Sequence, residues 1–297
     1  MPNIKAESLA VLALIVLTLI WSYNWIVTKQ VLLYIGALDF AAMRCALGAL
    51  LLLILLPLSG RSLKPPPWRP ILWIGLLQTV GMTGGSQLAL VAGGAGKTAV
   101  LVYTMPFWVI LLATLFLNEK QRLLQYVATA IAATGLVLVI QPWQWQGTLS
   151  SSLLAIVAGA SWAAASIVAK RAFRHQAVDL LSLVAWQMAI GAVVLSALAV
   201  ATHKTPIVWS RYMLTALAFN AVLATALCWV LWLFILRTLP AGIAGLSTLM
   251  IPVMSVLWAW WWLHERPDNA EGSGIGLILL ALALLGVPAI TKRRGNL

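Results

Sequence analysis

Charged residues are scarce in this sequence. Only 9% of its 297 residues are charged and 62% are hydrophobic, whereas ordinary soluble domains have roughly a quarter charged residues. Cysteine is nearly absent as well, because Cys45 and Cys228 are the only two. Each falls within an apolar run, which excludes a disulfide framework and favours small packing residues. Since a soluble fold could not bury so much apolar surface, the sequence indicates an integral membrane protein.

The apolar residues fall into ten runs, each long enough to cross a bilayer. A helix needs about 20 mostly apolar residues to span a hydrocarbon core about 30 Å thick. The predicted spans are 9–28, 38–57, 70–91, 95–116, 122–140, 149–169, 180–201, 210–236, 241–263 and 274–290. The first is expected to be a retained helix rather than a signal peptide, because it lacks a small-residue cleavage site and further spans follow it.

The stretch "GGAGKTAV" at 93–100 is similar to the end of a phosphate-binding P-loop. That motif requires a glycine five residues before Gly96, and Val91 stands there instead. The motif also joins a buried strand to a helix, whereas two long apolar runs flank this stretch. Its glycines are better explained by a tight turn between the third and fourth spans.

Basic residues give the chain a net charge of +12. Thirteen of the 19 lie near the termini or in even-numbered loops, and five lie in odd-numbered loops. By the positive-inside rule, this imbalance predicts that both termini are cytoplasmic, in a bacterial inner membrane. The membrane topology therefore explains the positive net charge, and we expect no nucleic-acid partner.

The two halves of the chain resemble each other. The segment "WSYNWIVTK" (Trp21 to Lys29) aligns with "WAAASIVAK" (Trp162 to Lys170), and Pro106 aligns with Pro252. Each half has five spans, an odd number, so the second half enters the membrane from the opposite side. This inverted repeat is typical of secondary transporters, whose substrate site lies near the midplane where the repeats meet. An old duplication in a membrane enzyme or scaffold is the alternative.

The predicted fold is therefore an all-α integral membrane protein. It has ten transmembrane helices in two inverted five-helix repeats, residues 1–145 and 146–297. In these features the chain resembles the drug/metabolite transporter superfamily and its EamA-type exporters, including bacterial exporters of aromatic and other amino acids. The resemblance covers essentially the whole chain and rests on the two repeats, Trp21 and Asn24, Arg44, and a proline followed by "NEK" or "HER". It implies a cavity lined by spans one, three, four, six, eight and nine, with spans five and ten peripheral.

Acidic residues and histidines are absent from the interior of the predicted spans. Proton-driven pumps usually keep such a group within a span as a relay, so we expect facilitated transport down the gradient of the solute. A membrane enzyme would need a nucleophile, a carboxylate pair or metal ligands, so we expect no enzyme, no cofactor and no metal. Arg44 is the only basic residue well inside a span, which favours a neutral or zwitterionic cargo over a phosphorylated one.

Arg44 lies about one and a half turns inside the second span. One interpretation is a structural anchor that snorkels to the outer face or pairs with Asp39. The other is a role in gating or substrate binding. Its counterpart in the second half is Gln187, so any charge-dependent role belongs to one half.

Aromatic and polar side chains share helix faces in several spans. In the first span Trp21 and Asn24 lie on one face with Thr18, Trp25 and Thr28. An indole can stack or contact an ammonium group, and an amide can bond a carboxylate or amine. The predicted substrate-binding residues are Trp21, Asn24, Gln78, Met82, Tyr103, Trp162, Ser166 and Trp229. Interhelical packing is the alternative.

Two prolines occupy equivalent positions within the fourth and ninth spans. Pro106 and Pro252 each remove a backbone hydrogen bond and are expected to kink their helices. The pair predicts hinges for alternating access, with static bends as the alternative. Glu119, at the end of the fourth span, is expected to pair with the adjacent Lys120, and Glu265 with Arg266.

These features predict a secondary transporter that exports aromatic and other neutral amino acids, or similar small metabolites, by alternating access. Its partners are then a small-molecule substrate and the lipid bilayer. Efflux of cationic drugs or other metabolites is the alternative, and cationic cargo would favour an acidic residue in the cavity. The sequence leaves open which solute is carried, the physiological direction and the oligomeric state, with a monomer as one option.

Overall fold

A computed structural model describes residues 4–92, 95–119, 123–141, 143, 149–175, 177–202, 206–263 and 268–294, and the regular elements within these ranges are helices. They are α1 (Ile4–Val31), α2 (Ala37–Leu58), α3 (Trp68–Ile74), η1 (Gly75–Gly84), α4 (Gly85–Ala92), α5 (Ala95–Val102), α6 (Met105–Leu117), α7 (Leu123–Ile140), α8 (Leu149–His175), α9 (Leu180–Thr202), α10 (Arg211–Phe219), η3 (Asn220–Leu227), α11 (Cys228–Thr238), α12 (Ala241–Ser247), α13 (Met250–Leu263) and α14 (Asn269–Arg294). The elements η1 and η3 are wide-turn π segments.

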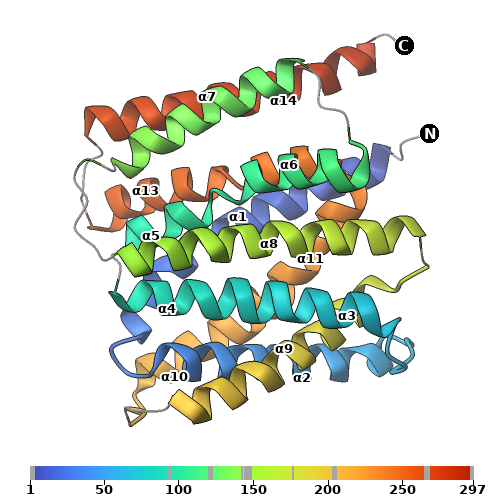
Figure 1. Cartoon of the computed structure of the whole chain (residues 1–297), viewed down its shortest axis with the longest axis vertical. Helices are drawn as coiled ribbons and strands as arrows, with labels where there is room; N and C mark the ends of the chain where they lie inside the picture. The colour runs from blue at the N-terminus through green and yellow to red at the C-terminus, as the bar shows by residue number, and fades with distance from the viewer. Residues whose placement is uncertain are drawn as a thin grey trace.

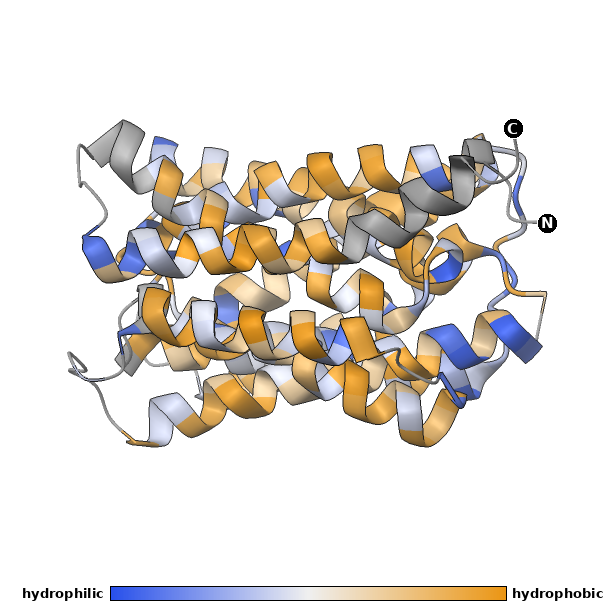
Figure 2. Cartoon of the chain, turned by 90° about the horizontal axis from the view of Figure 1, so that it is seen from above, coloured by the Kyte–Doolittle hydropathy of each residue, from blue (hydrophilic) through white to orange (hydrophobic). Residues whose placement is uncertain are grey.

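Helical segments cover the ten predicted spans. Five continuous helical stretches are long and apolar enough to cross a membrane, namely Ala6–Val31, Ala37–Leu58, Leu149–His175, Leu180–Thr202 and Arg211–Thr238. Shorter apolar helices account for parts of the remaining spans. In Figure 2 hydrophobic residues occupy the middle of the helices and hydrophilic residues gather at the two ends of the bundle, as expected for a membrane-spanning bundle.

The same irregularities occur in both halves. The third span contains η1 and the eighth contains η3, while the fourth and ninth spans are each broken into two helices, α5 with α6 and α12 with α13. π segments are rare in α-helical proteins and frequently occur at functional sites. Their matched positions fit the inverted repeat. The boundary proposed at residues 145 and 146 lies outside the described residues.

The expectation that Pro106 and Pro252 kink helix interiors is wrong. Pro106 is the second residue of α6 and Pro252 the third residue of α13. Both helices follow a tight turn, in which Thr104 N donates to Leu101 O at 3.2 Å and Thr248 N to Gly245 O at 3.0 Å. Because proline has no N–H and clashes with the preceding turn, the helix stops before it and restarts with the proline in its first turn.

The helices pack in a way that repeats between the halves. Helix α2 packs against α9, while η3 packs on α2 and η1 packs on α9. Helix α1 lies along α11 and α13, as α8 lies along α4 and α6. Helices α7 and α14 form a separate pair at one side of the bundle (Figure 1), which agrees with spans five and ten being peripheral.

Glycine allows η1 to lie close to its neighbours. A Cβ atom added at Gly75 would lie 2.6 Å from Gln187 O in α9, and one added at Gly81 would lie 2.2 Å from Ser161 Oγ in α8. Ser161 Oγ also donates to Leu77 O at 2.8 Å. Close approach of this kind is what small residues permit between membrane helices.

The chain ends define two ends of the bundle. Helix α1 begins and α14 ends at the same end (Figure 1), which we call the termini end, and the opposite end is called the distal end. Because α1 runs from the termini end to the distal end, its later residues mark the distal half.

Candidate substrate site

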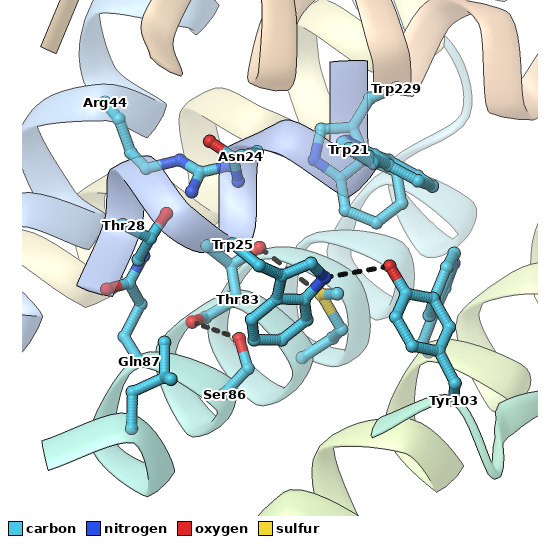
Figure 3. Close-up of a pocket in the computed structure, with 13 residues that line it drawn as sticks. Trp21, Asn24, Trp25, Thr28, Arg44, Thr83, Ser86, Gln87, Tyr103 and Trp229 are labelled. Atoms are coloured by element: carbon cyan, nitrogen blue, oxygen red, sulfur yellow. Dashed lines mark hydrogen bonds between the residues drawn. The ribbon is translucent and has the colours of Figure 1, made fainter. Parts of the chain in front are cut away.

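A pocket lies in the distal half of the bundle between both halves of the chain. Its lining residues are Trp21, Asn24, Trp25 and Thr28 from α1; Arg44 from α2; Met82 and Thr83 from η1; Ser86, Gln87 and Leu90 from α4; Tyr103 from the α5–α6 turn; Trp162 from α8; and Trp229 from α11 (Figure 3). Its volume is about 470 Å³ when the space at its open mouth is included.

Four aromatic side chains, Trp21, Tyr103, Trp162 and Trp229, form the aromatic floor of this pocket. The Trp21 ring lies 5.3 Å from Trp162 and 5.0 Å from Trp229, centroid to centroid, and Trp162 lies 6.3 Å from Tyr103. The rings meet edge to face, which is a favourable aromatic geometry. Trp162 is fully buried and Trp21, Tyr103 and Trp229 are almost so. The aromatic floor therefore closes the pocket on the side of the termini end.

Hydrogen bonds fix two indoles at the pocket. Trp21 Nε1 donates to Ala224 O in η3 at 2.9 Å, where the wide π turn leaves a backbone carbonyl open to a side-chain donor. Trp25 Nε1 donates to the Tyr103 hydroxyl at 3.0 Å. Each bond joins α1 to a helix distant in sequence, so the pocket shape depends on the π segment of the second half and on the broken helix of the first half.

Arg44 supplies the charge of the pocket. Its side chain is 6% exposed and its Nε donates to Thr225 Oγ1 in η3 at 2.8 Å. Figure 3 shows the side chain reaching toward the pocket, so the expectation that it snorkels to the outer face is wrong. The anchoring hydrogen bond and the position in the pocket occur together, because Nε and the two terminal nitrogens of guanidinium point in different directions.

Six of the eight predicted substrate-binding residues come together at this pocket: Trp21, Asn24, Met82, Tyr103, Trp162 and Trp229. Gln78 and Ser166 do not line it. Gln78 is fully buried within η1, where wide turns change the helical register that the sequence spacing assumed. Ser166 is fully buried one turn beyond Trp162, toward the termini end, and its hydroxyl donates to Trp162 O at 2.9 Å.

Sequence reasoning missed one polar wall of the pocket. Thr83, Ser86, Gln87 and Leu90 follow one another at intervals of three, one and three residues, which places them on one helix face. That spacing was present in the sequence. Gly85, which lies between two of these residues in sequence, packs against α8, since a Cβ atom there would lie 3.3 Å from Ala158 Cβ.

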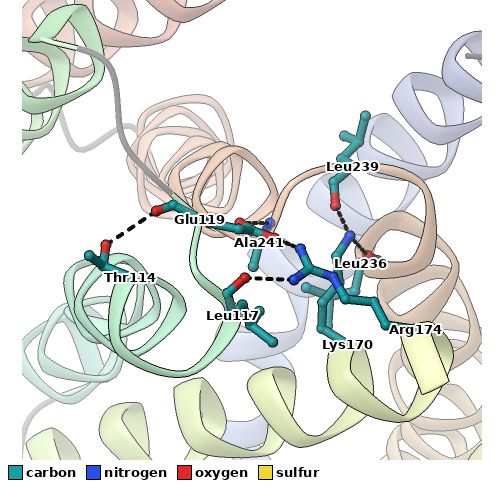
Figure 4. Close-up of polar contacts among 8 residues, drawn as sticks. All are labelled: Thr114, Leu117, Glu119, Lys170, Arg174, Leu236, Leu239 and Ala241. Carbon is teal, nitrogen blue, oxygen red and sulfur yellow. Dashed lines mark hydrogen bonds and ion pairs between the residues drawn. The ribbon is translucent and has the colours of Figure 1, made fainter.

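An ion pair joins three spans at the termini end. Glu119 Oε1 accepts from Arg174 Nη2 at 2.5 Å, and Glu119 Oε2 accepts from the N–H of Ala241, the first residue of α12, at 3.0 Å (Figure 4). Asn118 precedes it in the left-handed conformation, with φ of 53°, which asparagine tolerates at helix ends. Lys120, Glu265 and Arg266, expected as partners, lie outside the described residues, and Arg174 is the partner that the structure gives to Glu119.

Lys170 strengthens the same region. Its Nζ donates to Leu236 O at 2.5 Å and also to Leu239 O, both at the end of α11 (Figure 4). A cation at a helix C-terminus satisfies carbonyls that have no partner within the helix. We call Glu119, Lys170, Arg174 and Ala241 the termini-end tie. It holds α6, α8, α11 and α12 together at the termini end, away from the pocket.

Helical spans in two matching halves, with a pocket formed where the halves meet, are typical of secondary transporters. A sequence model of the EamA-like transporter family matches residues 8–141 and, a second time, residues 149–287. The chain belongs to the EamA-like transporter family. It is a multi-pass membrane transporter of small molecules and not an enzyme.

Several relatives share this length and organisation. The uncharacterized transporter YoaV of Bacillus subtilis is 29% identical over 261 residues, which cover 86% of this chain and 89% of that protein. The uncharacterized inner membrane transporter YedA of Escherichia coli K12 is 25% identical over 277 residues, which cover 92% of this chain and 89% of that protein. A riboflavin transporter of Rhizobium johnstonii is 34% identical over 108 residues, which cover 35% of this chain and 33% of that protein.

A solved structure has the same fold. A crystal structure described only as that of a protein aligns with a TM-score of 0.81 and covers 96% of this chain and 99% of that chain. Its sequence identity is 17%, so it supports the fold alone.

Proposed function

We propose that this chain exports aromatic and other neutral amino acids, or similar small metabolites, by alternating access. The observation that carries the proposal is the aromatic floor, where Trp21, Trp162 and Trp229 meet within a pocket that also holds polar groups. Indole rings bind flat or apolar side chains with large contact area and little loss of conformational entropy.

The orientation of the chain gives this pocket a direction. With both termini in the cytoplasm, as the distribution of basic residues favours, the pocket in the distal half opens to the outside and the termini-end tie closes the cytoplasmic side. The described conformation is then the one from which solute is released. The breaks before Pro106 and Pro252 are the proposed hinges, because a break without helical hydrogen bonds bends at lower cost than a continuous helix.

The transport is proposed to be facilitated. The lining residues that the structure describes include no Asp, Glu or His, the groups that carry protons in coupled pumps. Exchange should therefore be driven by the solute gradient and be insensitive to an imposed pH gradient.

Efflux of cationic drugs or other metabolites is the second candidate. Arg44 in the pocket disfavours a cation by direct repulsion. Aromatic metabolites remain compatible with the aromatic floor, and riboflavin is one to include among the test solutes, since a relative over a third of the chain is a riboflavin transporter.

The test is counterflow in liposomes that contain the purified full chain. Liposomes are loaded with one unlabelled solute at a time, and entry of labelled phenylalanine is followed with and without a pH gradient. Exchange with amino acids that ignores the pH gradient supports facilitated amino-acid transport. No exchange with any amino acid, from protein that elutes as a folded species, would retire that substrate class, while exchange with riboflavin or organic cations alone would select the second candidate.

A further inference from the structure

We propose that Arg44, together with the side-chain oxygens of Asn24, Thr28 and Gln87, forms a receptor for the charged end of a zwitterionic solute. Arg44 binds the carboxylate, the three oxygens bind the ammonium group, and the aromatic floor takes the rest of the solute. This inference rests on the proposed function and specifies how the same pocket recognises its substrate.

Arg44 is a buried cation without a counter-charge among the described residues. Its side chain is 6% exposed. The ion pairs between described residues are Arg61 with Asp179 and Arg174 with Glu119, and neither of them includes Arg44. A buried guanidinium is costly unless a counter-charge is present. Thr225 accepts only the Nε hydrogen, so the two terminal nitrogens keep the fork that binds carboxylates in a bidentate manner.

Three side-chain oxygens at the pocket lack a hydrogen-bond donor among the described residues. Asn24 Oδ1, Thr28 Oγ1 and Gln87 Oε1 are buried and form no hydrogen bond with the described residues. Thr28 is 3% and Gln87 2% exposed. Buried polar atoms are nearly always paired, so three unpaired oxygens on one pocket indicate a missing partner. An ammonium group offers three N–H donors, which matches three acceptors.

The polar groups and the aromatic floor lie at different sides of the pocket. Asn24 and Thr28 lie one turn apart on the same face of α1, and Gln87 faces them from α4. Figure 3 shows Thr28 and Gln87 together on one side of the pocket and Arg44 beside Asn24, with Trp21 and Trp229 together on the other side. A solute whose charged groups are both on one carbon can therefore reach the polar groups while its side chain extends to the aromatic floor.

The number of cationic side chains at the pocket restricts the charge that a bound solute can carry. Gln187, the counterpart of Arg44, accepts a hydrogen bond from Thr79 Oγ1 at 3.0 Å and does not line the pocket. Among the described lining residues, Arg44 is then the one cationic side chain. One carboxylate satisfies it, whereas a dianion or a phosphate ester would leave negative charge unpaired.

The experiment compares four solutes that share one ring. Counterflow of labelled phenylalanine into liposomes is competed with phenylalanine, phenylalaninamide without the carboxylate, 3-phenylpropionate without the ammonium group, and phenethylamine. We expect each of the three analogues to compete at least ten times more weakly than phenylalanine. Equal competition by phenylalaninamide would overturn the role of Arg44, and equal competition by 3-phenylpropionate would overturn the role of the three oxygens.

Variants connect the discrimination to Arg44. Arg44→Gln should reduce the difference between phenylalanine and phenylalaninamide to within about twofold, and Arg44→Lys should keep most of it, since a charge remains. Arg69→Gln, which removes an exposed arginine outside the pocket, should leave the discrimination unchanged. A purely structural Arg44 would lower all fluxes equally and preserve the ratio, which would contradict the proposal. The comparison of analogues on the unmodified chain decides the point if Arg44→Gln does not fold.

A binding measurement separates this inference from the transport proposal. The same four solutes are tested for thermal stabilisation of the purified protein in detergent. If phenylalanine alone of the four solutes stabilises the protein but no exchange occurs in liposomes, the receptor proposal is supported and amino-acid transport is rejected. If exchange occurs but the four solutes compete equally, amino-acid transport is supported and the receptor proposal is rejected. Equal stabilisation by acetate or chloride would show that Arg44 takes any anion and would overturn the zwitterion assignment.

Discussion

Arg44 Nε donates a 2.8 Å hydrogen bond to Thr225 Oγ1. The repeat contains an equivalent contact with the roles of the two halves exchanged. Thr79 Oγ1 donates to Gln187 Oε1 at 3.0 Å. Both contacts join the second span of one half to the π segment of the other half. The arrangement is symmetrical in position but only one of the two contacts carries a charge, so the two halves perform different roles at the pocket.

This asymmetry leads to a prediction for the two threonines. Thr225→Val removes the acceptor of a buried charged donor, and Thr79→Val removes a hydrogen bond between neutral groups. We expect both variants to unfold at lower temperature, with Thr225→Val losing about 1.5–3 kcal/mol and Thr79→Val about 0.5–1.5 kcal/mol of stability. Thermal unfolding of the purified proteins measures the difference. Equal losses would show that the charge of Arg44 is satisfied elsewhere.

Replacing each of the two tryptophans at the centre of the aromatic floor by phenylalanine should change the stability of the protein by different amounts. Trp21 Nε1 bonds Ala224 O, whereas Trp162 Nε1 has no hydrogen-bond partner among the described residues. Both substitutions remove part of a buried ring, but Trp21→Phe also leaves a carbonyl unpaired. We expect Trp21→Phe to be about 1 kcal/mol more destabilising than Trp162→Phe. Chemical or thermal unfolding provides the comparison, and the reverse order would contradict the assigned contacts.

Loosening the termini-end tie should favour opening of the cytoplasmic side. Glu119→Gln weakens the pair with Arg174 and the bond to Ala241, and a partly buried pair is worth more than an exposed one. Ser166→Cys, placed beyond the aromatic floor, reports the opening through its rate of labelling by a membrane-impermeant maleimide.

For this measurement the native thiols Cys45 and Cys228 are replaced by alanine, although both are buried. We expect Glu119→Gln to increase the labelling rate severalfold. Arg61→Gln, which breaks an exposed ion pair with Asp179, is the matched control and should leave the rate unchanged. An equal increase in both variants would mean that the tie has no specific role in closure.

Acid should weaken the start of α14. Asp268 Oδ1 accepts hydrogen bonds from Ala270 N and Glu271 N, each at 2.8 Å, and Oδ2 accepts from Gln141 Nε2 at 2.5 Å. The backbone bond from Glu271, followed by the bond from Gln141, lowers the pKa of the Asp268 carboxyl below its ordinary 3.8. A lowered folded-state pKa means that the stabilisation is complete above the unfolded pKa and is lost as the pH falls through the folded one.

Amide hydrogen exchange in the first turn of α14 measures this effect between pH 6 and pH 3. Protection should fall at the acid end of that range, below about pH 4. Asp268→Asn keeps an N-cap oxygen but cannot titrate, so its protection should be lower throughout and independent of pH. A variant that retains the acid dependence would assign the titration to another group.

Apolar runs and internal repeats were enough to predict an all-helical membrane protein with two related halves. Apolar runs of about 20 residues admit hardly any other structure, since backbone groups in hydrocarbon must be bonded within their own helix. Local periodicity also placed Trp21 and Asn24 on the face of α1 that lines the pocket, because side chains three residues apart on a helix share a face whatever surrounds it.

The contacts between side chains of distant spans could not be predicted from the sequence. Wide π turns displaced Gln78 from the pocket, Arg44 turned inward to Thr225, and Glu119 bonded Arg174 rather than a neighbour in sequence. Each outcome depends on a residue from a distant span that supplies or withholds a partner. Hydrogen bonding between helices is set by their packing in three dimensions, and the spacing of residues along one helix does not contain it.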